Sequence, residues 1–469
     1  MPRRERELAG LLLAVAVSLS GCDRLETPRP PLRGAILILL DTLRADHVSA
    51  YGHGRPTSPT LDRLAEGGVL FEQAISYSAW TLPSMAAILS GRFPARRDFD
   101  TELKRSLVER LSDAGWRTAA FTEGGYVSRY FGFDRGFDTW SDHADMAIGL
   151  KRSLHDLASI GIETTFPAAE AWLRGNSDRP FFLLIHTYEV HVPYRRRSFA
   201  EELPRGSLNP FVDEKDVTRI RSGQLVLGDT EYAYLDALYD GGILWADRAI
   251  ASLLGVLREL EIADSTLVVV TSDHGEDLGD HSPRFAADHG HSLADILVRV
   301  PLIVYDPTRE FSVARVAHQV RTVDILPTIL DLLGVDRDGD ADGRSLVPLM
   351  EGSENSDRIA FAHLRRYGRE VMALRVNGFK LIRGVSRRAD AGGEGRPEAG
   401  RPLALFDLGE DPAEHRNLLH THPNRLRHMM HRVDAILEEI GEPGIAEFTV
   451  DDSAPPELIE RLKALGYTE

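Results

Sequence analysis

Cysteine is almost missing from this chain, since Cys22 is the single one among 469 residues. An intrachain disulfide is therefore excluded, and no cysteine beyond residue 22 remains to bind a metal. Positive charge is also scarce, because 55 Lys and Arg residues face 72 Asp and Glu residues and the formal net charge is −17. Affinity for a nucleic-acid backbone rests on Lys and Arg, so we expect no nucleic-acid partner.

The N-terminal apolar run, Leu8 to Leu19, is too short for a transmembrane helix, which needs about 20 apolar residues. Arginines precede the run, and Leu19-Ser20-Gly21-Cys22 ends it. This order is typical of a secretory signal peptide, and its last four residues resemble a bacterial lipobox, in which the cysteine is lipidated. We expect residues 1–22 to be a lipoprotein signal, with an uncleaved or ordinarily cleaved signal as the alternative, and residues 23–33 to be a tether. The protein would then be anchored in the membrane of the bacterial cell envelope through lipidated Cys22, facing the periplasm or the exterior.

Apolar strand patterns alternate with helical patterns from Gly34 to about Asp336. The predicted core strands are Ala35–Leu40, Thr118–Thr122, Phe181–His186, Thr266–Ser272 and Leu302–Tyr305. The helices with the clearest start or stop signals are one that begins at Pro59 and ends at Gly67-Gly68, one at Thr101–Ala114, and one at Thr230–Leu260. The alternation predicts an α/β fold, with a mixed, mainly parallel sheet sandwiched by helices.

The pattern changes after residue 365, which divides the chain into a main domain at 34–365, a small α+β subdomain at 366–445 and a C-terminal tail at 446–469. The subdomain is predicted to contain an antiparallel strand at Val371–Arg383, a Gly-, Arg- and Pro-rich loop at Ala389–Pro402, a returning strand at Leu403–Phe406 and a closing helix at Asn424–Ile440.

Side chains of the kind that bind metals follow two of the predicted strands. Asp41 comes directly after the first strand, and Thr-Ser-Asp-His-Gly-Glu, residues 271–276, follows the apolar run Leu267–Val270. Open α/β sheets place their chemistry at the carboxyl ends of parallel strands, so Asp41, Asp273 and His274 can converge on one metal ion. A salt-bridged aspartate is the alternative interpretation, but charged groups at buried strand ends are unusual without a partner.

Short motifs spread over most of residues 34–440 form an ordered set. They are Asp41–Asp46, Thr57–Ala65, Trp80–Ser84, His186–Tyr194, Ser272–Glu276, His289–His291, Arg299–Ile303 and Leu405–Pro412. In this order they resemble the sulfatase family within the alkaline phosphatase superfamily. The resemblance implies an alkaline phosphatase/sulfatase-like fold and a metal-dependent hydrolase of sulfate or phosphate esters.

Two features depart from the sulfatase pattern. Sulfatases carry a Cys or Ser that becomes formylglycine, with Pro two residues later and Arg four residues later; here these positions hold Thr81, Pro83 and Met85. Threonine cannot become formylglycine. The family's Gly-Lys-Trp-His segment is also missing, and Thr122–Tyr126 stands in its place. Thr81 instead resembles the nucleophile of superfamily relatives that cleave phosphodiesters or transfer phosphoethanolamine or glycerol phosphate.

The resemblance implies that Thr81 is the catalytic nucleophile and also a metal ligand, beside Asp41, Asp273 and His274. Thr81 directly precedes the predicted helix Leu82–Ser90, so a plain N-capping threonine is the alternative interpretation. The imidazole of His274 favours zinc or manganese as the divalent cation, with calcium or magnesium as alternatives.

Two histidines are expected near the reacting group. His191 matches the family position that touches the transferred group, and His289 lies in an Asp-His-Gly-His run. Either can protonate the leaving oxygen or hold a second cation, with Glu189 as a further ligand. His186 and His281 are interpreted as structural.

A charge count bears on the substrate. One divalent cation, two carboxylates and an alkoxide sum to about −1, which favours substrates of about one negative charge, either sulfate monoesters or phosphate diesters. We therefore expect a hydrolase of small-molecule, glycan or lipid esters that forms a covalent intermediate on Thr81. The alternatives are a phosphodiesterase or a transferase of phosphoethanolamine or glycerol phosphate, and a catalytically inactive sulfatase-like lipoprotein.

Overall fold

The computed structural model of the chain describes residues 31–96, 103, 105–142, 161–336, 341–366, 368–388, 396–440, 450 and 454–465. The predicted lipoprotein signal with Cys22 lies outside the described residues. Among the residues that are described, no helix combines the length and the apolar character needed to cross a membrane.

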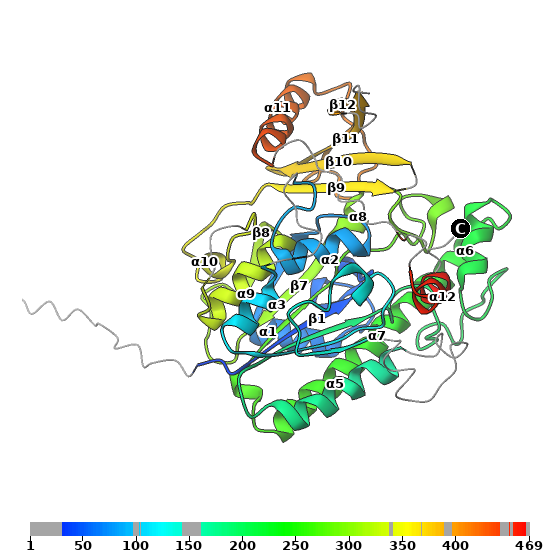
Figure 1. Ribbon diagram of the computed structural model, residues 1–469. Helices are drawn as coiled ribbons and strands as arrows, with labels where there is room; N and C mark the ends of the chain where they lie inside the picture. The colour runs from blue at the N-terminus through cyan, green and yellow to red at the C-terminus, as the bar shows by residue number, and fades with distance from the viewer. Residues whose placement is uncertain are drawn as a thin grey trace, which may run out of the picture.

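An eight-stranded sheet forms the centre of the main domain, with its strands in the order β4-β3-β5-β1-β6-β7-β2-β8 (Figure 1). The strands are β1 (Gly34–Leu40), β2 (Val69–Ile75), β3 (Arg117–Phe121), β4 (Thr139–Ser141), β5 (Phe181–Thr187), β6 (Thr266–Thr271), β7 (Arg299–Tyr305) and β8 (Arg315–Arg321). Strand β7 is antiparallel to both of its neighbours, whereas all the other neighbouring pairs are parallel. The sheet is therefore mixed and mainly parallel, as predicted.

All five predicted core strands are present in this sheet. Strands β1 and β5 are buried at every position, which explains their nearly continuous apolar sequences, because a parallel sheet is covered on both faces. Strands β2, β4 and β8 were not predicted. Strand β2 carries Glu72 and Gln73 at a register irregularity, and β8, at the edge of the sheet, mixes polar and apolar residues. Neither has the unbroken apolar run that identified the central strands.

Helices cover both faces of the sheet (Figure 1). They are α1 (Pro59–Gly67), α2 (Thr81–Ser90), α3 (Leu107–Asp113), α5 (Ile162–Asn176), α6 (Glu214–Arg221), α7 (Asp229–Glu259), α8 (Asp295–Val298), α9 (Ile325–Leu333) and α10 (Val347–Met350). Successive residues of β1 point to opposite faces. Leu37 and Leu39 join the apolar cluster that contains residues of α2 and α9, while Ile36 and Ile38 join the cluster that contains residues of α5 and α7.

The predicted first and third helices agree with α1 and α7, but the predicted helix Thr101–Ala114 begins later. Helix α3 starts at Leu107, and Ser106 is its N-cap, with a hydroxyl that accepts a hydrogen bond from the Glu109 backbone N at 3.3 Å. The cap fixes the start of the helix at this point.

A four-stranded antiparallel sheet and one helix form the C-terminal subdomain, at the top of Figure 1. Its elements are β9 (Ala360–Arg366), β10 (Arg369–Val376), β11 (Phe379–Arg388), β12 (Arg396–Asp407) and α11 (Pro423–Ile440). The sheet begins with β9, several residues before the predicted boundary at 365. The closing helix and the returning strand are confirmed by α11 and the end of β12.

Two predictions for this subdomain were wrong. The segment Val371–Arg383 is a hairpin rather than one strand, because Asn377 and Gly378 adopt positive φ angles of 50° and 74° and form the turn between β10 and β11. Asn-Gly is the strongest short hairpin signal, and it interrupts an otherwise regular alternation. In the predicted loop Ala389–Pro402, residues 396–402 belong to β12, whereas 389–395 lie outside the described residues.

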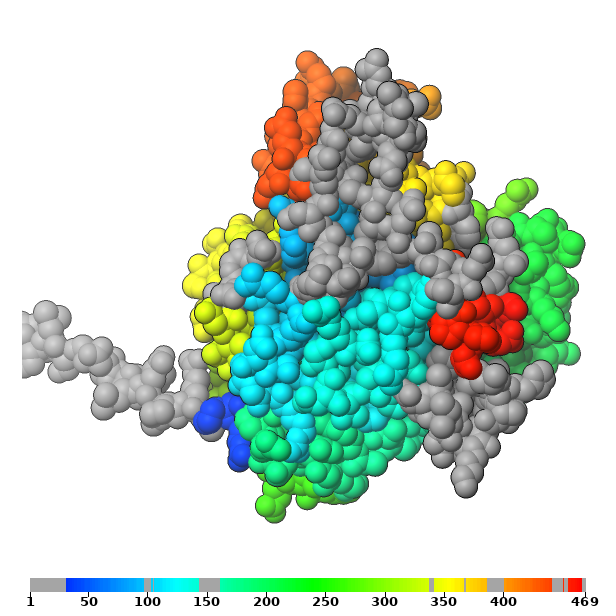
Figure 2. All heavy atoms as spheres, in the orientation of Figure 1, coloured from blue at the N-terminus to red at the C-terminus, as the bar shows by residue number. Residues whose placement is uncertain are grey.

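The predicted C-terminal tail contains a packed helix, α12 (Pro456–Ala464). Leu458 and Leu462 of α12 are buried in the same apolar cluster as β1 and α2. Helix α12 therefore packs on the main domain, away from the C-terminal subdomain that precedes it in the sequence (Figures 1 and 2).

A buried lysine joins the subdomain to the main domain. Lys380 of β11 is 1 % exposed, and its Nζ lies 3.0 Å from Asp295 Oδ1 of α8 and 2.8 Å from Glu414 Oε1. Buried charges are tolerated only when they are paired, so these three side chains depend on one another.

Replacement of this lysine is expected to destabilise the protein strongly. Lys380→Met removes the cation that pairs with buried Glu414 and leaves Asp295 with Arg375 alone, and it should lower the free energy of unfolding by about 3 kcal/mol. Arg416→Met is the matched control, because Arg416 pairs with Glu410 on the exposed surface and its loss should cost less than about 1 kcal/mol. Urea unfolding followed by circular dichroism measures both. Equal losses in the two variants would contradict the role of Lys380.

Candidate active site

The structure brings together the four predicted metal ligands. Asp41 follows β1, Asp273 and His274 follow β6, Thr81 is the first residue of α2, and all four are fully buried. Thr81 Oγ1 lies 3.1 Å from Asp41 Oδ2 and 3.3 Å from His274 Nε2. His274 Nε2 lies 3.4 Å from Asp273 Oδ2 and 3.7 Å from Asp41 Oδ1. The cluster forms because β1 and β6 are adjacent parallel strands that end at the same edge of the sheet.

The atoms of this cluster fit a divalent cation. Asp41 Oδ1 and Asp273 Oδ2 are buried and accept no hydrogen bond within the described part of the chain. A buried carboxylate oxygen without a partner is costly, and a bound cation removes that cost. The Nδ1 atom of His274 lies 2.9 Å from the Gly275 carbonyl oxygen, so Nδ1 carries the proton and Nε2 presents its lone pair to the cluster. Ligand atoms of Asp41, Asp273 and His274 all lie within 4.8 Å of one another.

Burial and mutual repulsion perturb the ionisation of these groups. Burial, followed by the neighbouring Asp273 carboxylate, raises the pKa of Asp41 well above its ordinary value. Burial lowers the pKa of His191 to about 3 and also lowers the pKa of His289 well below its ordinary value. Both imidazoles are therefore neutral at neutral pH.

Thr81 does not cap α2, so the capping interpretation was wrong. Trp80 is the N-cap residue, and Thr81 is the first residue of the helix. The Thr81 hydroxyl instead donates to Asp41 Oδ2, which turns it away from the helix backbone. Met85, where the sulfatase pattern has an arginine, is fully buried in the apolar cluster and brings no charge to the site.

The two other predicted catalytic residues, His191 and His289, lie beside the cluster. The ring centroid of His289 is 4.5 Å from that of His274 and 5.1 Å from that of His191. His289 Nδ1 is 2.9 Å from Glu276 Oε1, and His191 Nδ1 contacts the Val192 carbonyl oxygen, so both rings are fixed through Nδ1. These contacts hold a row of imidazoles next to Thr81.

Glu189, predicted as a further ligand, is directed elsewhere. Its carboxylate forms an ion pair with Arg196, with 3.0 Å between Arg196 Nη2 and Glu189 Oε2. His281 also lies apart from the cluster, stacked on His291 with ring centroids 6.4 Å apart.

His186, interpreted above as structural, lies at the cluster instead. It is fully buried near the end of β5, and its Nε2 is 3.4 Å from Asp41 Oδ2. Neither of its ring nitrogens has a hydrogen-bond partner among the described residues. Its position near the end of a buried strand is the same signal that identified Asp41, and it was available in the sequence.

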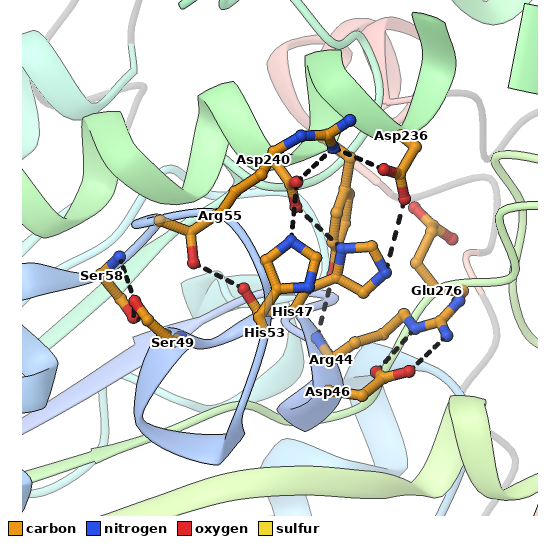
Figure 3. Close-up of polar contacts among 12 residues, drawn as sticks. Arg44, Asp46, His47, Ser49, His53, Arg55, Ser58, Asp236, Asp240 and Glu276 are labelled. Carbon is orange, nitrogen blue, oxygen red and sulfur yellow. Dashed lines mark hydrogen bonds and ion pairs between the residues drawn. The ribbon is translucent and has the colours of Figure 1, made fainter. Parts of the chain in front are cut away.

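A polar network fixes the loop that follows Asp41 to helix α7 (Figure 3). Asp240 of α7 is fully buried and lies 2.8 Å from His47 Nδ1, 2.8 Å from His53 Nε2 and 2.6 Å from Arg55 Nη1. His47, His53 and Asp240 are spaced closely enough to hold a metal. However, Arg55 already supplies a positive charge to Asp240 and to Asp236, which makes a second cation unfavourable there.

Comparison with solved structures shows the class of fold to which this chain belongs. A protein solved in complex with its substrate D-glucosamine-2-N,6-O-disulfate matches with a TM-score of 0.66 and 19% identity, covering 89% of this chain and 100% of its own. The phosphonate monoester hydrolase of Agrobacterium radiobacter matches with a TM-score of 0.66 and 19% identity, covering 91% and 99%. The chain therefore has the alkaline phosphatase/sulfatase-like fold.

Sequence comparison shows the family. The family model described as Sulfatase matches residues 34–335. Human arylsulfatase A is 25% identical over 87% of this chain and 86% of its own length. The multifunctional alkaline phosphatase superfamily protein PehA of Trinickia caryophylli is 24% identical over 69% of this chain and 78% of its own length. The chain belongs to the sulfatase family and is a sulfatase-like ester hydrolase.

Metal binding should stabilise the protein through the Asp41 cluster alone. After removal of metal with a chelator, zinc or manganese at 100 times its dissociation constant should add about 2.7 kcal/mol of stability. Asp273→Asn should abolish this gain in stability. Asp240→Asn should retain it, because Asp240 is already paired with Arg55 and is not expected to bind the metal. Differential scanning calorimetry with and without metal measures the effect. If the gain in stability survives in Asp273→Asn and disappears in Asp240→Asn, the cation binds at His47, His53 and Asp240, and the prediction is wrong.

Proposed function

We propose that this protein is a metal-dependent hydrolase of sulfate or phosphate esters, with Thr81 as its nucleophile and Asp41, Thr81, Asp273 and His274 as its metal ligands. The observation that carries the proposal is the position of Thr81 Oγ1, 3.1 Å from Asp41 Oδ2 and 3.3 Å from His274 Nε2. The unpartnered oxygens of Asp41 and Asp273 beside it support a cation at this place. Membership of the sulfatase family supports ester hydrolysis.

The donor set favours zinc or manganese. It combines the imidazole nitrogen of His274 with carboxylate and hydroxyl oxygens, whereas calcium and magnesium prefer oxygen ligands alone. A divalent cation held here lowers the pKa of an adjacent hydroxyl and neutralises negative charge on the ester.

The side chains of this site account for a two-step reaction. Asp41 accepts the hydrogen bond of the Thr81 hydroxyl and orients Oγ1 towards the sulfur or phosphorus atom. The Thr81 hydroxyl gives up its proton to solvent, and its oxygen forms a bond to that atom while the bond to the leaving oxygen breaks. Water then attacks the same atom in line, the bond to Thr81 breaks, and the Thr81 oxygen regains a proton from the attacking water. His191 and His289 are neutral, so they suit hydrogen bonding or a second cation better than donation of a full proton, and the leaving oxygen takes its proton from water.

Charge at the site favours substrates that carry about one negative charge. Two carboxylates and a deprotonated Thr81 outweigh one divalent cation by about one unit. Arg366 of β9 adds positive charge nearby, since its guanidinium lies 5.1 Å from the centroid of the Trp80 ring and a Cβ on Gly290 would lie 2.6 Å from its Nη1. Sulfate monoesters and phosphate diesters of small molecules, glycans or lipids meet this condition.

Thr81→Ala should abolish ester hydrolysis. We expect kcat to fall about a thousandfold or more, because the variant loses the hydroxyl that contacts both Asp41 Oδ2 and His274 Nε2. The assay compares 4-nitrophenyl sulfate, 4-nitrophenyl phosphate and bis(4-nitrophenyl) phosphate with zinc-, manganese- or calcium-loaded enzyme. Thr81→Ser is the control, since it keeps a hydroxyl at the same place and should retain part of the activity.

Each outcome of this assay has a definite meaning. Activity that survives Thr81→Ala rejects Thr81 as the nucleophile. Formation of glycerol phosphate esters when glycerol is added favours the transferase alternative. Stoichiometric metal without turnover of any ester favours the inactive lipoprotein.

We also propose that the protein is a lipoprotein anchored through Cys22, because Leu19-Ser20-Gly21-Cys22 follows a basic and apolar leader. Radiolabelled palmitate should be incorporated into the wild-type protein in a bacterial host and not into Cys22→Ser. Because Cys22 is the only cysteine, incorporated label reports on this residue without interference from another thiol. A wild-type protein that takes up no label would reject the anchor.

A further inference from the structure

Helix α12 reaches the candidate active site from the far end of the sequence. Its residues Leu458 and Leu462 are buried in the main-domain core, and Leu465 is 4 % exposed just after the helix. A Cβ on Gly125 would lie 2.9 Å from Leu465 Cδ1 and 2.9 Å from the Tyr188 hydroxyl oxygen. The helix therefore packs against the segment after β3 and the segment after β5, two strands that end at the same edge of the sheet as β1.

Arg461 is the charged residue on the buried face of this helix. It is 5 % exposed, and its Nε donates a hydrogen bond to the Glu123 carbonyl oxygen at 2.9 Å. Its Nη2 lies 3.4 Å from Glu123 Oε2, and its guanidinium lies 5.6 Å from the centroid of the Tyr188 ring. Arg461 thus balances the charge of Glu123, which is itself only 2 % exposed.

Glu123 connects Arg461 to the strand that supports Asp41. Its Oε1 accepts a hydrogen bond from Thr187 Oγ1 at 2.6 Å, and its Oε2 accepts one from the Tyr188 backbone N at 3.0 Å. The Thr187 carbonyl oxygen in turn accepts the Asp41 backbone N–H at 3.0 Å. A continuous path of polar contacts therefore runs from α12 to the first predicted metal ligand.

The buried charge of Glu123 requires a positive charge beside it, and Arg461 supplies that charge. Glu123 is a buried carboxylate that follows β3, and it lies on the same edge of the sheet as Asp41 and Asp273. An isolated buried carboxylate is unstable, whereas one that is paired and hydrogen-bonded can hold its neighbours in place. Arg461 contacts Glu123 and the ring of Tyr188, and Glu123 carries the hydrogen-bonded path onward to the backbone of Asp41.

We propose that Arg461 is a positioning residue of the active site, which through Glu123 holds the Thr187 segment and the backbone of Asp41 in place. Helix α12 then contributes a residue on which the geometry of the site depends. The kinetic part of this inference rests on the proposed function, whereas its effect on metal binding does not require turnover.

The test uses the full chain and a cycle of charge changes. The variants are Arg461→Met, Arg461→Lys, Glu123→Gln and the double variant Glu123→Gln/Arg461→Met. Lys463→Met is the matched control, because Lys463 lies on the same helix, is exposed and pairs with the exposed Glu460. Zinc affinity is measured by competition with a chelator. The values of kcat and KM are measured with the best chromogenic ester, and the melting temperature is measured by calorimetry.

We expect Arg461→Met to weaken zinc binding and lower kcat/KM, each by about tenfold or more, because it leaves Glu123 buried without its partner. Arg461→Lys should recover part of the loss. The double variant should recover most of it, because it removes both charges together, whereas a helix that acts only through apolar packing would give additive losses. Lys463→Met should match the wild type.

Two results would overturn the inference: an Arg461→Met variant that binds zinc and turns over ester as well as Lys463→Met does, or a double variant no better than Arg461→Met. If Arg461→Met does not fold, the comparison of Arg461→Lys with the double variant decides the same question. A wild-type protein without turnover would reject the proposed function, and the zinc-affinity cycle would still test the role of Arg461.

Discussion

Burial of like charges at one edge of the sheet is the constraint on which this structure depends. Asp41 and Asp273 end neighbouring parallel strands, and both are withdrawn from water. In the interior two carboxylates at this separation repel strongly unless positive charge lies between or beside them. Two imidazoles, those of His186 and His274, lie 3.4 Å and 3.7 Å from the Asp41 carboxylate, and the Thr81 hydroxyl donates a hydrogen bond to it. The backbone of Asp41 is held by a hydrogen bond to Thr187.

Two of the guanidinium groups near the site come from late in the chain. Arg366 belongs to the first strand of the C-terminal subdomain, and Arg461 belongs to the last helix. The helix at which Thr81 lies contributes none, because Met85 is buried among apolar side chains. The main domain supplies the candidate metal ligands, and these two later elements each add a guanidinium group to the surroundings of the site.

The sequence allowed prediction of those parts of the fold and site that depend on local patterns. Strand ends revealed Asp41, Asp273 and His274, because an apolar run followed by a polar residue is a local signal. The same signal was present at His186, but an imidazole near a strand end is also common in cores, and it was interpreted as structural. The Asn377-Gly378 turn was overlooked because the alternation on both sides continued through it.

Arg461 could not be predicted from any local pattern. It lies more than three hundred residues from its partner, with a sequence separation of 338 between Arg461 and Glu123. Its role depends on where α12 docks, and docking is decided by apolar packing against the whole domain. An arginine on an amphipathic C-terminal helix is ordinarily a solvated residue, so only the three-dimensional arrangement distinguishes it.

The position of α12 also has a consequence for how the protein matures. Contacts between residues so distant in the sequence form late, because a long loop must close before they can be made. The segment that carries Asp41 leaves the ribosome long before α12 does. A nascent chain, or one clipped before α12, therefore contains Thr81 and the metal-type ligands without the guanidinium that contacts Glu123. If Arg461 positions the site as proposed, the site reaches its working geometry only after α12 has been made and has docked.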